Sequence, residues 1–98
     1  MGLSVIDRGF LDKIIDKEIA EIPSQVKSFR EPRIKTKFQL KEPNDFVFGV
    51  AFGTMLDSFS SYYTQIYQKP PTQSEIDEVV SVIDNRIAEI RNAIFNCG

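Results

Sequence analysis

The chain has 98 residues, which is the length of one domain with a thin hydrophobic core. Hydrophobic residues make up 42% of it and charged residues 27%, which excludes an intrinsically disordered or fibrous protein. The formal net charge of −2 gives no overall attraction to nucleic acid or anionic lipid, so any such binding must be local.

The sequence predicts a protein of the reducing cytoplasm. Cys97 is the only cysteine, so the chain cannot form an internal disulfide. Charges at Asp7 and Arg8 interrupt the apolar start of the chain, and we expect no secretory signal. Residues 46–67 are the most apolar segment, but Asp57 and several hydroxyl side chains lie within it. We therefore expect no membrane partner.

Residues 5–22 are predicted to form an amphipathic N-terminal helix. The apolar residues at helical spacing are Leu11, Ile15, Ile19 and Ile22. Pro23 removes a backbone hydrogen bond, which predicts a kink followed by a short helix over residues 23–30.

Residues 33–41 alternate between apolar and polar side chains, which is typical of a strand. The apolar positions are Ile34, Phe38 and Leu40, and basic residues occupy most of the others. Because one strand cannot satisfy its own backbone groups, this basic extended connector pairs with another chain, lies as an edge, or is a loop.

Residues 44–68 and 73–96 are predicted to form two long helices packed as an antiparallel hairpin. Asn44 or Asp45 is expected to cap the first helix. Lys69, Pro70 and Pro71 end it, and Thr72 with Glu75 has the spacing of a capping box for the second.

The two predicted helices carry apolar residues at matching positions. In the first they are Phe48, Phe52, Met55, Phe59, Tyr62 and Ile66, and in the second Ile76, Val80, Ile83, Ile87, Ile90 and Ile94. Each position in one helix mirrors a position in the other about Pro71. This symmetry predicts a coiled-coil-like seam between them.

The predicted fold is therefore a single all-α, or nearly all-α, domain over residues 1–98. Residues 46–56 are apolar nearly all round, which indicates burial on more than one side and predicts a dimeric bundle. The predicted oligomer interface consists of Phe46, Val47, Gly49, Val50 and Gly53. Gly49 and Gly53 either admit another backbone or accommodate bulky phenylalanines within one core.

Histidine is absent from the sequence, which removes the commonest general base and transition-metal ligand. We therefore expect no enzyme activity, no catalytic residues, no metal site and no cofactor. Asp57 and Arg86 are predicted to form an ion pair across the hairpin. The hydroxyls of Tyr62, Tyr63 and Tyr67 are expected to reach water beside the core, with a ligand site as the alternative.

Residues 27–41 carry a net charge of +5 within this acidic chain. The candidate nucleic-acid-binding residues are Arg30, Arg33, Lys35, Lys37 and Lys41, which either contact phosphates or enter a DNA groove as a two-stranded ribbon. A lysine-protected strand edge is the other interpretation. The function that we expect is a noncatalytic interaction or assembly module that self-associates or binds a protein partner, with a nucleic-acid-binding regulator as the alternative.

Overall fold

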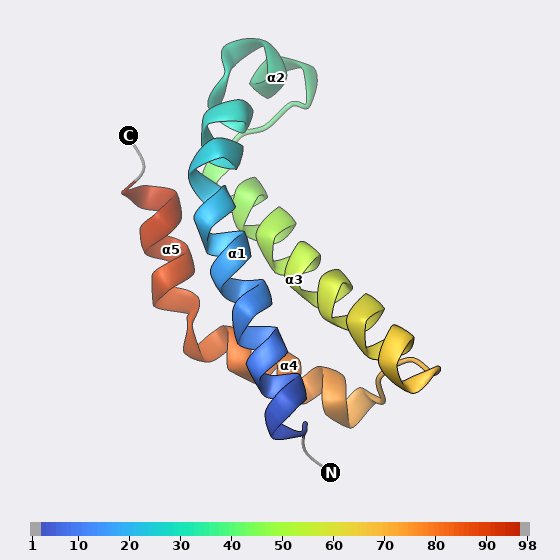
Figure 1. The fold of residues 1–98 in the computed structure, drawn as a ribbon. Coiled ribbons are helices and arrows are strands. Elements are labelled where there is room, and N and C mark those ends of the chain that lie inside the picture. The colour runs from blue at the N-terminus through green and yellow to red at the C-terminus, as the bar shows by residue number, and fades with distance from the viewer. Residues whose placement is uncertain (1–2, 97–98) are drawn as a thin grey trace.

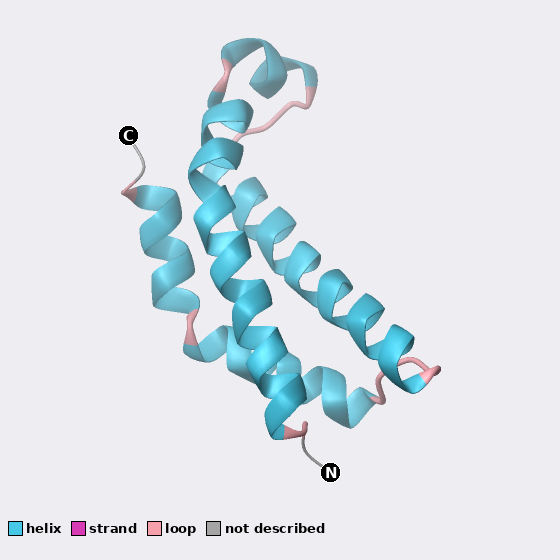
Figure 2. Ribbon diagram, viewed as in Figure 1, coloured by secondary structure: helices cyan, strands magenta, loops and turns pink. Residues whose placement is uncertain are grey.

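The computed structural model describes residues 3–96, so Cys97 lies outside the described part of the chain. Within this range every regular element is a helix (Figures 1 and 2), which confirms the all-α prediction. The helices are α1 (Val5–Arg30), α2 (Pro32–Lys37), α3 (Pro43–Tyr67), α4 (Gln73–Asn85) and α5 (Ile87–Phe95).

Helix α1 is the central element of the molecule. It packs along α3 on one side and against α5 on the other, and α3 and α5 also touch each other. Helix α4 passes behind the N-terminal half of α1 in the view of Figure 1 and connects α3 with α5. Helix α2 lies at the opposite end, and the molecule measures 45 × 24 × 17 Å.

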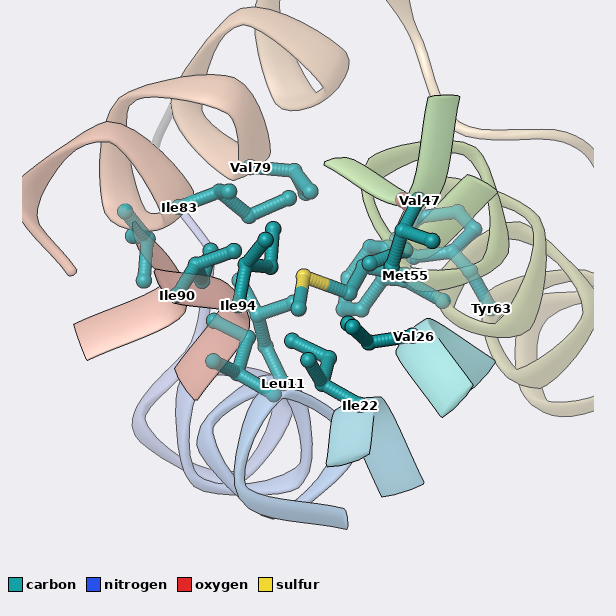
Figure 3. Close-up of a cluster of buried hydrophobic side chains, with 14 residues drawn as sticks. Leu11, Ile22, Val26, Val47, Met55, Tyr63, Val79, Ile83, Ile90 and Ile94 are labelled. Atoms are coloured by element: carbon teal, nitrogen blue, oxygen red, sulfur yellow. The ribbon is translucent and has the colours of Figure 1, made fainter. Parts of the chain in front are cut away.

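The hydrophobic core lies where α1, α3, α4 and α5 converge (Figure 3). Its buried residues are Leu11, Ile15, Ile22, Val26, Val47, Ala51, Met55, Phe59, Tyr63, Val79, Val82, Ile83, Ile90 and Ile94. All four long helices contribute, because none of them can bury its apolar stripe against a single neighbour.

Helix α1 runs through Pro23 without a break, so the predicted end at residue 22 and the separate short helix are wrong. The Ser4 side chain caps its start by accepting a hydrogen bond from the Asp7 backbone N–H. Ile22 and Val26, on either side of the proline, are both fully buried. Their packing outweighs the cost of an interior proline, which is about 3 kcal/mol.

The predicted strand over residues 33–41 is wrong, because most of it forms the short helix α2. Pro32 occupies the first helical turn, where its missing N–H is harmless, and the Glu31 side chain accepts hydrogen bonds from the next two free N–H groups. Ile34 and Phe38 lie four residues apart, a spacing that also fits a helix. With no partner strand among residues 3–96, local capping decides the conformation.

The last predicted helix, residues 73–96, is interrupted at Arg86 and forms α4 and α5. Thr72 and Glu75 form the predicted capping box at its start. Arg86 lies on the same face as the buried Ile83 and Ile90. A charged side chain on this face must be satisfied there, and the break lets Arg86 reach carboxylates of α1.

The core face of α3 also differs from the predicted seam. Its buried residues recur every fourth position from Val47 to Tyr63, whereas the seam residue Ile66 is 57% exposed. Val80 and Ile87, which were expected in the seam of the last helix, are 36% and 38% exposed. The prediction paired α3 with the last helix alone, but α1 is the principal neighbour of α3, and α4 and α5 make smaller contacts with it.

Gln68 follows the last residue of α3 and caps the helix in the left-handed conformation, with φ of 61°, and its N–H donates to the Thr64 carbonyl. Glycine adopts this conformation without the steric cost that a side chain adds. We predict that Gln68→Gly raises the free energy of unfolding by about 0.5–1 kcal/mol. Urea denaturation followed by circular dichroism measures this change.

Gln65→Gly is the matched control, because Gln65 is an exposed residue inside the same helix. Glycine in a helix interior should lower the free energy of unfolding by roughly 0.5–1 kcal/mol. Equal destabilisation by both variants would show that Gln68 does not adopt the left-handed conformation in solution.

Candidate functional site

The outer face of α3 carries four of the five residues predicted for an oligomer interface. Helix α3 forms one flank of the molecule and lies beside α1 (Figure 1). Phe46, Gly49, Val50 and Gly53 are exposed or half-buried on it, and we call these four residues the α3 strip. Val47, the fifth predicted residue, is fully buried in the core, where a second copy cannot reach it.

Neither glycine of the α3 strip is required by packing within the chain. Apart from the adjacent residues and backbone of α3 itself, a Cβ built on Gly49 or Gly53 would meet no atom within 4 Å. The alternative that these glycines accommodate phenylalanines inside one core therefore does not hold. Each glycine destabilises the helix by about 1 kcal/mol relative to alanine, and no contact within the described residues offsets this cost.

The five predicted nucleic-acid-binding residues lie together at the α2 end of the molecule but are not equally accessible. Arg33, Lys35, Lys37 and Lys41 are exposed. Arg30 instead donates from Nε and Nη2 to the Asn44 side-chain oxygen, at 3.2 and 2.9 Å, and thereby joins the end of α1 to the start of α3. Neither Asn44 nor Asp45 caps α3 as predicted, because the N-cap position is Glu42 and no side chain caps this helix.

Aromatic rings connect this basic end to the α3 strip. Phe29 lies between Phe38, at 6.3 Å between ring centroids, and Phe46, at 4.8 Å in an edge-to-face arrangement. Phe38 remains 51% exposed although it contacts Phe29. The end of the molecule near α2 thus presents an aromatic face beside its cations.

A carboxylate and two tyrosines form a polar cluster that sequence analysis missed. Asp7 is 4% exposed, and its two carboxylate oxygens accept hydrogen bonds from the hydroxyls of Tyr62 and Tyr67, each at 2.8 Å. Tyr63 donates to Glu75 at 2.6 Å. The sequence predicted that these hydroxyls reach water, and it did not predict the carboxylates to which they donate. The sequence shows the tyrosines but gives no signal that Asp7, far away in the chain, lies beside them.

These contacts shift the pKa values of the groups involved. Burial raises the pKa of the Asp7 carboxyl, but the hydrogen bonds that it accepts outweigh burial and hold the pKa below its ordinary value. Burial and the bond to Asp7 raise the pKa of Tyr62 to about 12. The bond to Glu75 and burial raise the pKa of Tyr63 to about 12, and the bond to Asp7 raises that of Tyr67.

Arg86 makes a different ion pair from the predicted one. Its guanidinium contacts Asp16 and Asp12 of α1 and Glu89 of α5. It also donates to the Asp12 carbonyl at 3.3 Å. Asp57 is exposed on the opposite side of α1, in the groove between α1 and α3. Arg86 therefore fastens the α4–α5 junction to α1.

Two open grooves flank α1. The groove between α1 and α3 has a volume of about 570 Å³, and Glu18 lines it as a buried carboxylate that accepts a hydrogen bond from Gln25 at 2.9 Å. The groove between α1 and α5, of about 760 Å³, is mostly apolar around Pro23 and Ala93. Residues 3–96 contain no group of three or more acidic or cysteine side chains positioned to hold a metal ion.

The raised tyrosine pKa values predict how the protein behaves in alkali. A tyrosine that ionises at about 12 when folded and about 10 when unfolded contributes stability that is fully present below pH 10. This stability is lost as the pH rises from about 10 toward 12. Absorbance at 295 nm should show tyrosine ionisation of the folded protein well above pH 10.

Tryptophan is absent and the chain has only three tyrosines, so the signal is unambiguous. The same titration in denaturant should centre near pH 10. Tyr62→Phe should lower the free energy of unfolding at neutral pH by about 1–3 kcal/mol, because the buried Asp7 carboxylate loses a donor. A folded tyrosine that ionises near pH 10 would contradict the hydrogen-bonded cluster.

No protein-family model matches the sequence, and neither a curated protein nor a solved structure is significantly similar to it. None of the helices in the described range is both long and apolar enough to span a bilayer.

Proposed function

We propose that this chain is a noncatalytic assembly module that pairs with a second copy of itself through the α3 strip. The open space around Gly49 and Gly53 carries the proposal. Two glycines four residues apart on one helix let another helix backbone approach closely, and a close backbone contact would offset their cost to helix stability.

The composition of α3 supports the same surface. No charged residue occurs between Asp45 and Asp57, although Gly49 and Gly53 are exposed in this half of the helix. Phe46 is 37% exposed and Val50 is half-buried, so an apolar side chain lies beside each glycine. A two-fold dimer would bury this surface against itself, with the same residues contributed by both copies.

The noncatalytic part of the proposal rests on the side chains available. The chain has no histidine, and the hydroxyls of its three tyrosines all donate to carboxylates. Asp7 and Glu75 are in turn occupied by these bonds. The groups best placed for proton transfer are thus used to hold α1, α3 and α4 together.

We predict that the wild-type protein has the mass of a dimer at micromolar concentration, measured by light scattering after size exclusion. Gly53→Leu should convert it to a monomer, because the new side chain prevents close contact between backbones. Gly9→Leu is the matched control. Gly9 is also an exposed helical glycine whose Cβ would meet no atom within 4 Å, but it lies on α1.

Both substitutions replace a poor helix former with a good one, and the added Cβ has open space at either position. The monomeric Gly53→Leu protein should therefore keep its helical circular dichroism, and Gly9→Leu should remain a dimer. A wild-type mass that stays monomeric over a hundredfold concentration range would disprove self-association. Dimers of unchanged affinity in Gly53→Leu would place the interface elsewhere.

A further inference from the structure

Charge is strongly segregated along this molecule. Residues 27–41 carry a net charge of +5, whereas the rest of the chain carries −7. This segment comprises the last turns of α1, helix α2 and the loop before α3, which together form one end of the elongated structure (Figure 1). We call its exposed cations, Lys27, Arg33, Lys35, Lys37 and Lys41, the basic apex.

Three cations of the basic apex belong to α2, and the other two flank this helix in the chain. Lys35 and Lys41 line one shallow hollow with Thr36 and Gln39, and Lys27 and Arg33 line another. Within residues 3–96, none of the five cations of the basic apex forms an ion pair with an acidic side chain. The concentration of unneutralised charge attracts a polyanion to this end, while the acidic remainder repels one from the body of the molecule.

The geometry does not suit duplex DNA. The two-stranded ribbon expected from the sequence is absent, and α2 has six residues. Such a helix is about 9 Å long, so it presents too few side chains to follow a major groove. A long duplex lying along the protein would also meet the acidic remainder of the chain.

A single strand avoids both obstacles. It is flexible enough to contact only the apex, and its unstacked bases expose faces that stack on aromatic rings. Phe38 directly follows Lys37 and is 51% exposed beside these cations. We infer that the basic apex is a binding site for single-stranded nucleic acid, in which lysines and arginine contact phosphates and Phe38 stacks on a base.

Binding of this kind is independent of base sequence, because phosphates and base faces occur in every strand. Its dependence on salt is set by the number of cations. On single strands each phosphate contact contributes about −0.7 to the slope of log affinity against log salt concentration. Five cations therefore limit this slope to roughly −3.5.

The experiment titrates the wild-type protein into a fluorescent oligothymidylate of about 15 nucleotides, at about 50 mM salt, and measures anisotropy. Lys35→Glu with Lys37→Glu should weaken binding at least about tenfold, because two phosphate contacts are lost and two repulsions added. Lys13→Glu with Lys17→Glu is the control. It makes the same change in net charge with two exposed lysines of α1 that lie outside the apex.

Phe38→Leu tests the stacking contact separately. It keeps an apolar side chain against Phe29 but removes the aromatic face, and it should weaken binding about fivefold or more without changing the salt slope. Circular dichroism confirms that each variant is folded before its affinity is compared.

Absence of binding by the wild-type protein at low salt would overturn the proposal. Equal losses in the two double variants would show a general charge effect without a site at the apex. Binding of the matching duplex as tightly as the single strand would overturn the assignment to single strands. Binding to phosphatidylserine vesicles without binding to the oligonucleotide would assign the apex to an anionic membrane surface instead.

Discussion

Burial of the apolar stripe of α1 between α3 and α5 is the interaction on which the rest of the structure depends. Leu11, Ile15, Ile22 and Val26 are fully buried along almost the whole helix. Burial of a large aliphatic side chain contributes about 1.5–3 kcal/mol, so this stripe stabilises the fold by more than the interior proline destabilises it. It also determines which face of α3 points inward, because α1 is the principal neighbour of that helix.

Polar contacts fix α1 at both ends and near its middle. Asp7 holds the end of α3 through two tyrosine hydroxyls, and Arg30 holds the start of α3 through Asn44. Between them, Asp12 and Asp16 receive Arg86 from the α4–α5 junction. Such contacts are directional, unlike hydrophobic burial, and they therefore specify how far each helix slides along its neighbour.

The two proposed surfaces lie outside this framework. The α3 strip and the basic apex contribute almost nothing to the core, yet Phe29 contacts both Phe46 of the strip and Phe38 beside the apex. Pairing through the strip would place two basic ends near each other if the copies align in parallel. Linked sites of this kind bind one long ligand more tightly than either site alone.

The sequence by itself determined the helical elements whose signals are local. The capping box at Thr72 and Glu75, the break at Pro70 and Pro71, and the uncharged first half of α3 all depend on residues close together in the chain. It also identified the glycines and the cluster of cations. Capping and chain stiffness act over one helical turn, and they can therefore be evaluated without knowing the fold.

Only the tertiary structure decided which faces meet. The sequence pattern matched the last two predicted helices to each other. In the structure the principal neighbour of α3 is α1, and the predicted seam residues Ile66 and Ile87 are exposed. Whether residues 33–41 formed a strand depended on a partner strand, and whether residues 73–96 stayed one helix depended on the carboxylates that Arg86 reaches. The link between Asp7 and the tyrosines had no local signal at all. Long-range contacts decide such questions, because a side chain is satisfied only by the neighbours that the folded chain brings to it.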